Sequence, residues 1–122
     1  MNIDSTREYY ARLPLSELCQ CDYCRNYMKE IRNGYPEADR YLQKIGIDIA
    51  KPFEAMPLEP DDKGNIEYIA VQYIVLGSKD DFVATRVAGV NIDLAESHPN
   101  TELEEEHFVL EISPILLKWT VS

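Results

Sequence analysis

The feature that most constrains the fold of this chain is a long apolar run from Ile66 to Leu76. Its residues are mostly β-branched, aromatic or aliphatic, which favours a β-strand. Apolar side chains would lie on both faces, so we expect this strand to be central in a sheet or covered on both sides. Gly77–Asp81 predicts a hairpin loop, followed by a return strand over 82–94 that bends at Gly89.

Helical periodicity precedes this sheet region. Apolar residues repeat at helical spacing after Asp22, which we expect to be the N-cap of a helix. Gly34 fits the left-handed position that ends such a helix, and Pro36 fits the first position of the next one, over 36–44. So short a connection between two helices predicts a helical hairpin.

Shorter signals complete the pattern. Ser5 and Glu8 form a capping box, which predicts a short helix over 6–12. The segment 46–65 is rich in proline and in turn residues, so we expect an ordered loop there. Alternation over 108–113 predicts a further strand, and Ile115–Trp119 predicts a last strand or short helix after Pro114.

This order of elements predicts the fold class. A chain of 122 residues usually forms one domain, so we expect a single domain over 1–122. Helices followed by strands indicate an α+β arrangement. We predict an N-terminal helical hairpin, with a short preceding helix, packed on a C-terminal antiparallel β-meander of three to four strands.

All three cysteines of the chain, Cys19, Cys21 and Cys24, lie within one short segment. Residues two apart in an extended segment point to the same side, so Cys19 and Cys21 should face together. Cys24 follows where the chain turns into a helix, so the three sulfurs can converge. Zinc binds four ligands in a tetrahedron, with sulfur at about 2.3 Å.

The cysteines supply three ligands, and a fourth must come from elsewhere. The chain has two histidines, His98 and His107, and Asp22 or a water molecule is the other option. We predict a structural zinc site formed by the residues Cys19, Cys21, Cys24 and His107.

Two other roles for the cysteines stay open. In the first alternative, the cysteines are reduced thiols, and Cys24 packs as a small apolar residue. In the second they serve a thiol- or metal-dependent enzyme, because a cysteine near a helix N-terminus and beside Arg25 has a lowered pKa. The odd number of cysteines does not indicate a disulfide framework.

The net charge of −10 argues against two classes of partner. An acidic surface repels phosphate backbones and anionic lipids, so we expect neither nucleic-acid nor membrane binding. The N-terminal sequence lacks the basic start and apolar run of a signal peptide, and no apolar run is long enough for a bilayer. We therefore expect a cytoplasmic protein.

These features predict a small protein-binding module with a protein partner or a homodimer. Most tyrosines lie in the first third of the chain, and they either pack the helices on the sheet or form an interface. An alternative is an immunity- or inhibitor-type protein that neutralises a basic enzyme through acidic residues of the second half, Glu102, Glu104, Glu105 and Glu106.

Overall fold

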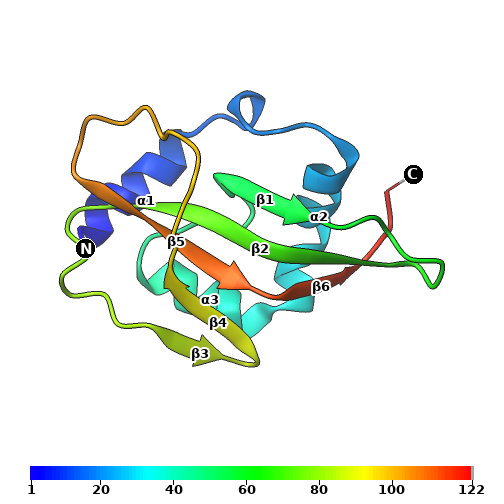
Figure 1. Cartoon of the computed structure of the whole chain (residues 1–122). Coiled ribbons are helices and arrows are strands. Elements are labelled where there is room, and N and C mark those ends of the chain that lie inside the picture. The colour runs from blue at the N-terminus through cyan, green and yellow to red at the C-terminus, as the bar shows by residue number, and fades with distance from the viewer. Residues whose placement is uncertain (122) are drawn as a thin grey trace.

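The computed structural model describes residues 1–121. Helices occupy the first part of the chain and strands the second (Figure 1). The helices are α1 (Ile3–Arg12), the short 3-10 helix η1 (Leu15–Glu17), α2 (Asp22–Gly34) and α3 (Pro36–Lys44). The strands are β1 (Glu54–Pro57), β2 (Asn65–Leu76), β3 (Thr85–Val87), β4 (Val90–Leu94), β5 (His107–Ser113) and β6 (Ile115–Lys118). This order confirms the predicted α+β class.

Strand β2 is the centre of an antiparallel sheet of six strands. The order is β1-β2-β5-β4-β3, and β6 pairs with the first part of β2. Every side chain from Ala70 to Leu76 is buried, as expected for a strand that is apolar on both faces. The sheet is larger than the predicted meander of three to four strands, and its strands do not follow one another in sequence order.

The segment 82–94, expected as one bent return strand, forms the two short strands β3 and β4. They are joined at Ala88 and Gly89, whose φ angles are 49° and 86°. Two consecutive residues with positive φ are what a two-residue hairpin turn needs to match the strand twist. Within residues 1–121, β4 pairs with β5 and neither short strand pairs with β2. The predicted hairpin at Gly77 is therefore wrong, because β5 occupies that edge of β2.

The segment 46–65, expected as a loop, contains the strand β1. Its pairing with β2 shifts between Ala55 and Pro57, so it is too short and irregular to show an alternating pattern. The rest of the segment does form turns. The Asp61 carboxylate accepts hydrogen bonds from the backbone N–H groups of Lys63 and Asn65, both at 2.9 Å.

Helix α1 begins at Ile3 because Asn2 caps it. The Asn2 side-chain oxygen accepts a hydrogen bond from the Ser5 N–H at 3.0 Å, which satisfies one free amide of the first turn. The predicted capping box at Ser5 and Glu8 is wrong, because the N-cap is Asn2. Ser5 lies inside the helix, and its backbone N–H is the donor that Asn2 satisfies.

Helix α1 also completes the edge of β2 beyond the end of β1. The Asn2 N–H donates to the Leu76 carbonyl at 2.8 Å, and the Leu76 N–H donates to the Thr6 hydroxyl at 3.0 Å. The Tyr10 hydroxyl donates to the Ile74 carbonyl at 2.7 Å. These bonds satisfy backbone groups that an open strand edge would leave unpaired.

Helices α2 and α3 have the predicted order, but two of their ends differ from the prediction. Cys21, and not Asp22, is the N-cap of α2, and Asp22 forms an ion pair with Arg25. Gly34 is the last helical residue, not a left-handed residue beyond the helix. A side chain at Gly34 would come within 2.9 Å of Leu117 Cδ2, so this glycine allows α2 to pack closely on β6.

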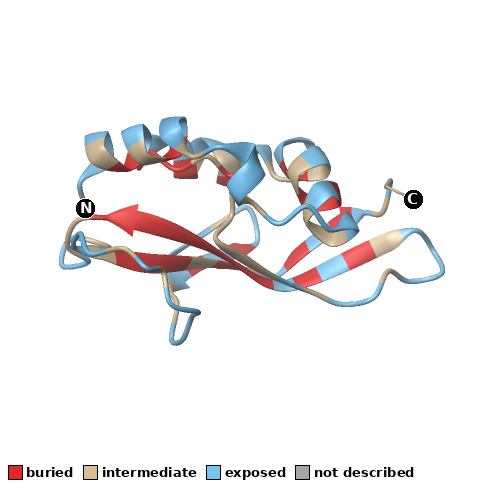
Figure 2. Cartoon of the chain, turned by 90° about the horizontal axis from the view of Figure 1, so that it is seen from above, coloured by how far each residue is buried: buried red, intermediate tan, exposed pale blue. Residues whose placement is uncertain are grey.

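The core lies between the helices and one face of the sheet. Figure 2 shows the helices on that side, with their buried surfaces turned toward the strands. The largest fully buried side chains come from α2, α3, the segment after α3 and four strands: Tyr27, Ile31, Leu42, Ile47, Ile49, Ile66, Tyr68, Tyr73, Ile92, Leu110, Ile112 and Ile115.

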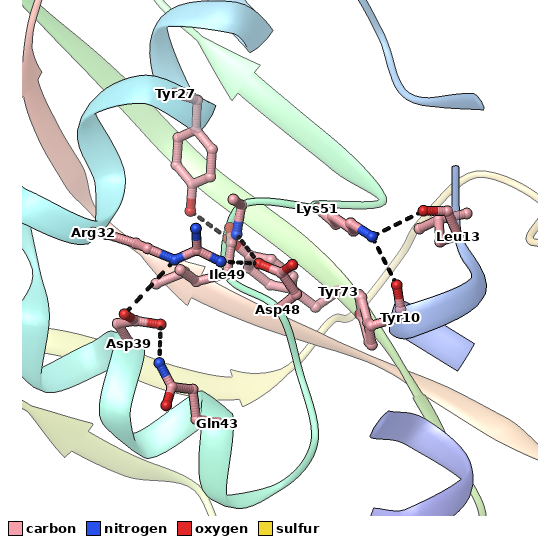
Figure 3. Close-up of polar contacts among 11 residues, drawn as sticks. Tyr10, Leu13, Tyr27, Arg32, Asp39, Gln43, Asp48, Ile49, Lys51 and Tyr73 are labelled. Atoms are coloured by element: carbon pink, nitrogen blue, oxygen red, sulfur yellow. Dashed lines mark hydrogen bonds and ion pairs between the residues drawn. The ribbon is translucent and has the colours of Figure 1, made fainter. Parts of the chain in front are cut away.

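A chain of hydrogen bonds crosses this core and holds the segment after α3 in place (Figure 3). The Tyr73 hydroxyl donates to the Ile49 carbonyl at 2.7 Å and accepts from the Tyr27 hydroxyl. At the surface, Arg32 Nη2 pairs with Asp48 Oδ1 at 2.6 Å. The two contacts fix the backbone that leads from α3 toward β1.

Asn26 of α2 fixes the C-terminal end of the chain. Its side chain is fully buried, donates to the Lys118 carbonyl at 2.9 Å and accepts from the Thr120 N–H at 2.8 Å. The Tyr35 hydroxyl accepts from the Leu116 N–H at 2.8 Å. Side chains of α2 and Tyr35 thus satisfy the outer edge of β6.

We predict that Tyr73→Phe destabilises the protein more than Tyr27→Phe does. Loss of the Tyr27 hydroxyl removes one hydrogen bond and costs about 1 kcal/mol. Loss of the Tyr73 hydroxyl leaves the Tyr27 hydroxyl and the Ile49 carbonyl buried without partners, which costs about 3 kcal/mol. Urea unfolding of both variants measures the difference, and equal losses would contradict the arrangement of donors.

We also predict that the protein loses stability in alkali. Burial raises the pKa of Tyr10, Tyr27 and Tyr73, so these groups stay protonated when the unfolded chain has already ionised. A raised folded-state pKa gives stability that is complete below about pH 10 and is lost above it. The free energy of unfolding should fall by up to about 1.4 kcal/mol per pH unit for each such tyrosine. Urea unfolding at pH 8, 10 and 11 tests this, and a constant value would refute it.

Candidate metal centre

The cysteine segment is folded back on itself between η1 and α2. The Gln20 side-chain amide donates to the carbonyl oxygens of Leu15 and Leu18, at 2.7 and 3.1 Å. Cys21 then occupies the N-cap position of α2 without a capping hydrogen bond from its side chain, and Cys24 lies in the first turn of this helix. The local fold thus places one cysteine before the cap, one at the cap and one in the helix.

The three sulfurs converge as the spacing predicted. Cys19 Sγ and Cys21 Sγ are 3.2 Å apart, and all three sulfurs lie within 4.8 Å of one another. In a tetrahedral zinc site with bonds of 2.3 Å, sulfurs are about 3.8 Å apart, which falls between these values. The group can therefore hold a metal ion.

Exposure separates the cysteines from ordinary packed thiols. Cys19 and Cys21 are exposed, and Cys24 is half-buried. A reduced cysteine that serves only packing is among the most buried residues. The alternative in which all three are packed thiols fits Cys24 alone.

The cysteines also differ in acidity. The pKa of Cys19 is lowered, because hydrogen bonding with the Cys21 backbone and with the Cys21 and Cys24 side chains stabilises its thiolate. The pKa of Cys24 is raised, because the side chain is half-buried and lies beside the other two sulfurs. Metals bind thiolates, so the lowered pKa of Cys19 favours the form of this side chain that a metal ion binds.

The histidines lie elsewhere. Within residues 1–121, the group of converging ligand atoms contains the three sulfurs and no histidine. The His107 ring nitrogens contact the Thr101 hydroxyl and the Glu105 carbonyl, both at 2.7 Å. The His98 ring packs edge-on against Phe53. Both histidines line a separate depression, so this arrangement does not support His107 as the fourth ligand.

A cavity of 460 Å³ opens beside the three cysteines. It lies between α1, the cysteine segment, the segment 51–57 and the loop at 100–102. In Figure 1 the blue connection from α1 to α2 runs above β1 at this place. Aromatic and apolar side chains form much of the wall: Tyr9, Leu13, Leu18, Tyr23, Met28 and Phe53. The charged lining residues are Glu17, Lys51, Glu54 and Glu102.

The Lys51 side chain lines this cavity and is hydrogen-bonded to the C-terminal end of α1 (Figure 3). Its ammonium group donates to the carbonyl oxygens of Tyr10 and Leu13, at 2.8 and 2.9 Å. These carbonyls lie at the C-terminal end of the helix, where a cation is favourable. The grouping of Lys51 with Glu17, Glu54 and Glu102 was not predicted, because these residues come from separate segments of the chain and no local pattern in the sequence indicates that they meet.

The acidic residues proposed as a partner contact are exposed. Glu104, Glu105 and Glu106 lie in the loop before β5, and Glu102 lines the cavity as well. A basic partner for them stays a prediction. Within the described residues, no helix is both long enough and apolar enough to span a bilayer.

Comparisons with models of protein families, with curated proteins and with solved structures find no match for this chain.

We predict that Cys19 of the metal-free protein is alkylated faster than Cys24 at neutral pH. Cys19 is exposed and has a lowered pKa, whereas Cys24 is half-buried and has a raised pKa. Timed reaction with iodoacetamide, followed by peptide mass spectrometry, gives the order. Faster reaction at Cys24 would contradict this description of the site.

Proposed function

We propose that the protein binds one zinc ion through the thiolates of Cys19, Cys21 and Cys24. The convergence of three sulfurs within 4.8 Å is the observation that carries this proposal. Zinc favours thiolates, and it holds them without redox chemistry of its own. The exposure of Cys19 and Cys21 gives the ion a path from solvent.

We further propose that the fourth position of this ion faces the cavity. Structural zinc sites have four protein ligands, whereas sites that act on a ligand keep three and leave one position open. All three cysteines line the 460 Å³ cavity, so a position left open by them would face it. This makes zinc-dependent ligand binding a better-supported role than a closed structural site.

Zinc analysis of protein purified without a histidine tag tests the proposal, and about one zinc per chain is expected. Cys→Ser at position 19, 21 or 24 should weaken zinc binding by more than the 10–100-fold that loss of an outer-shell partner causes. A chelator should lower the melting temperature of the wild-type protein, because an ion that binds only the folded state stabilises it.

His107→Ala is the matched control. It should retain full zinc binding, since His107 lies outside the sulfur group. If His107→Ala loses as much zinc affinity as the cysteine variants do, His107 is the fourth ligand. Metal-free protein whose melting temperature does not change with added zinc would refute the whole proposal.

The other expected functions stay predictions. A protein-binding role draws support from three exposed neighbours in one row: Leu58, which directly follows β1, Glu67 of β2 and Leu116 of β6. Exposed apolar residues beside acidic ones suit a basic partner. An enzymatic role for the cysteines likewise stays a prediction.

A further inference from the structure

The cavity beside the cysteines has the dimensions and walls of a small-molecule site. Ligand pockets usually measure about 300–1,000 Å³ and combine apolar walls with a few polar groups. This one measures 460 Å³, and Tyr9 and Phe53 contribute aromatic surface to it. A ligand inside it would lie directly beside the sulfurs of the proposed metal site.

The charge of the cavity is negative. Three carboxylates line it, from Glu17, Glu54 and Glu102, against the single cation of Lys51. The Lys51 ammonium already donates to two backbone carbonyls, so part of its capacity to bind an anion is used. Glu54 and Cys19 line the same cavity.

The metal centre would add to this negative field. Three thiolates and one divalent ion sum to a charge of −1 at the proposed site. A fourth ligand therefore approaches an anionic centre in a cavity whose own charged residues are mainly acidic. Like charges in such a site repel, and a cation is attracted.

We propose that the cavity binds a small ligand that combines a metal-binding sulfur or ring nitrogen with a positive charge. An aminothiol or an amino-imidazole has this chemistry. Its sulfur or ring nitrogen would take the fourth position of the metal, and its ammonium group would lie among the carboxylates of Glu17, Glu54 and Glu102. The proposal rests on the proposed function, because the metal holds the donor atom.

Cobalt-substituted protein tests this proposal under anaerobic conditions, because the visible bands of Co²⁺ report a new fourth ligand. Two matched pairs of probes are used: cysteamine with mercaptoacetate, and histamine with imidazole-4-acetate. The two members of each pair share the same donor atom and differ in the charge of their other group. In each pair the cationic member should bind at least about tenfold more tightly at low salt, and the difference should shrink in high salt. Gel filtration after each titration confirms that the cobalt remains bound.

Variants locate the preference in the cavity. Glu54→Gln and Glu17→Gln should each reduce the ratio of the affinity for the cationic probe to the affinity for the anionic probe. Glu67→Gln is the matched control, because this exposed carboxylate lies on β2 and outside the cavity lining, and the ratio should not change.

The outcomes distinguish this proposal from the one on which it rests. If cobalt binds to the three cysteines but its visible bands do not change with any of the four probes, the proposed ligand is wrong and the metal site still stands. Equal or tighter binding of the anionic probes would overturn the charge argument. Protein that binds no cobalt would overturn both.

Discussion

The rest of the structure depends on how the backbone edges of β2 are satisfied. Strands β5 and β6 cover one edge, and β1 covers only part of the other. Beyond β1, helix α1 supplies the missing partners for Ile74 and Leu76. This docking brings the C-terminal end of α1 beside Lys51, which binds two of its carbonyl oxygens. The cavity exists because a helix, and not a strand, completes this edge.

The parts of the fold that depend on local pattern were predictable. The apolar run at 66–76 and the proline at the start of 36–44 located β2 and α3 closely. Strand order was not predictable, since Gly77–Asp81 resembles a hairpin loop although the partner of β2 along that edge is β5. The choice between partners depends on packing between distant segments, which a local pattern does not record.

In the site too, features set by the local sequence were predictable, and features set by the packing of distant segments were not. The convergence of Cys19, Cys21 and Cys24 follows from their spacing and from the start of α2, both of which are local. His107 was chosen because the chain has only two histidines, and its surroundings in the loop before β5 could not be known. The cavity draws its lining from five separate stretches of the chain, so its acidic character became visible only in three dimensions.

We propose that three cysteine sulfurs bind one metal ion and leave its fourth position open to the cavity. X-ray absorption at the zinc edge of zinc-loaded protein tests it most directly. We expect three sulfur neighbours at about 2.3 Å and one lighter neighbour from water. Fewer than three sulfur neighbours, four sulfur neighbours, or the scattering pattern of a histidine ring in the fourth position would contradict it.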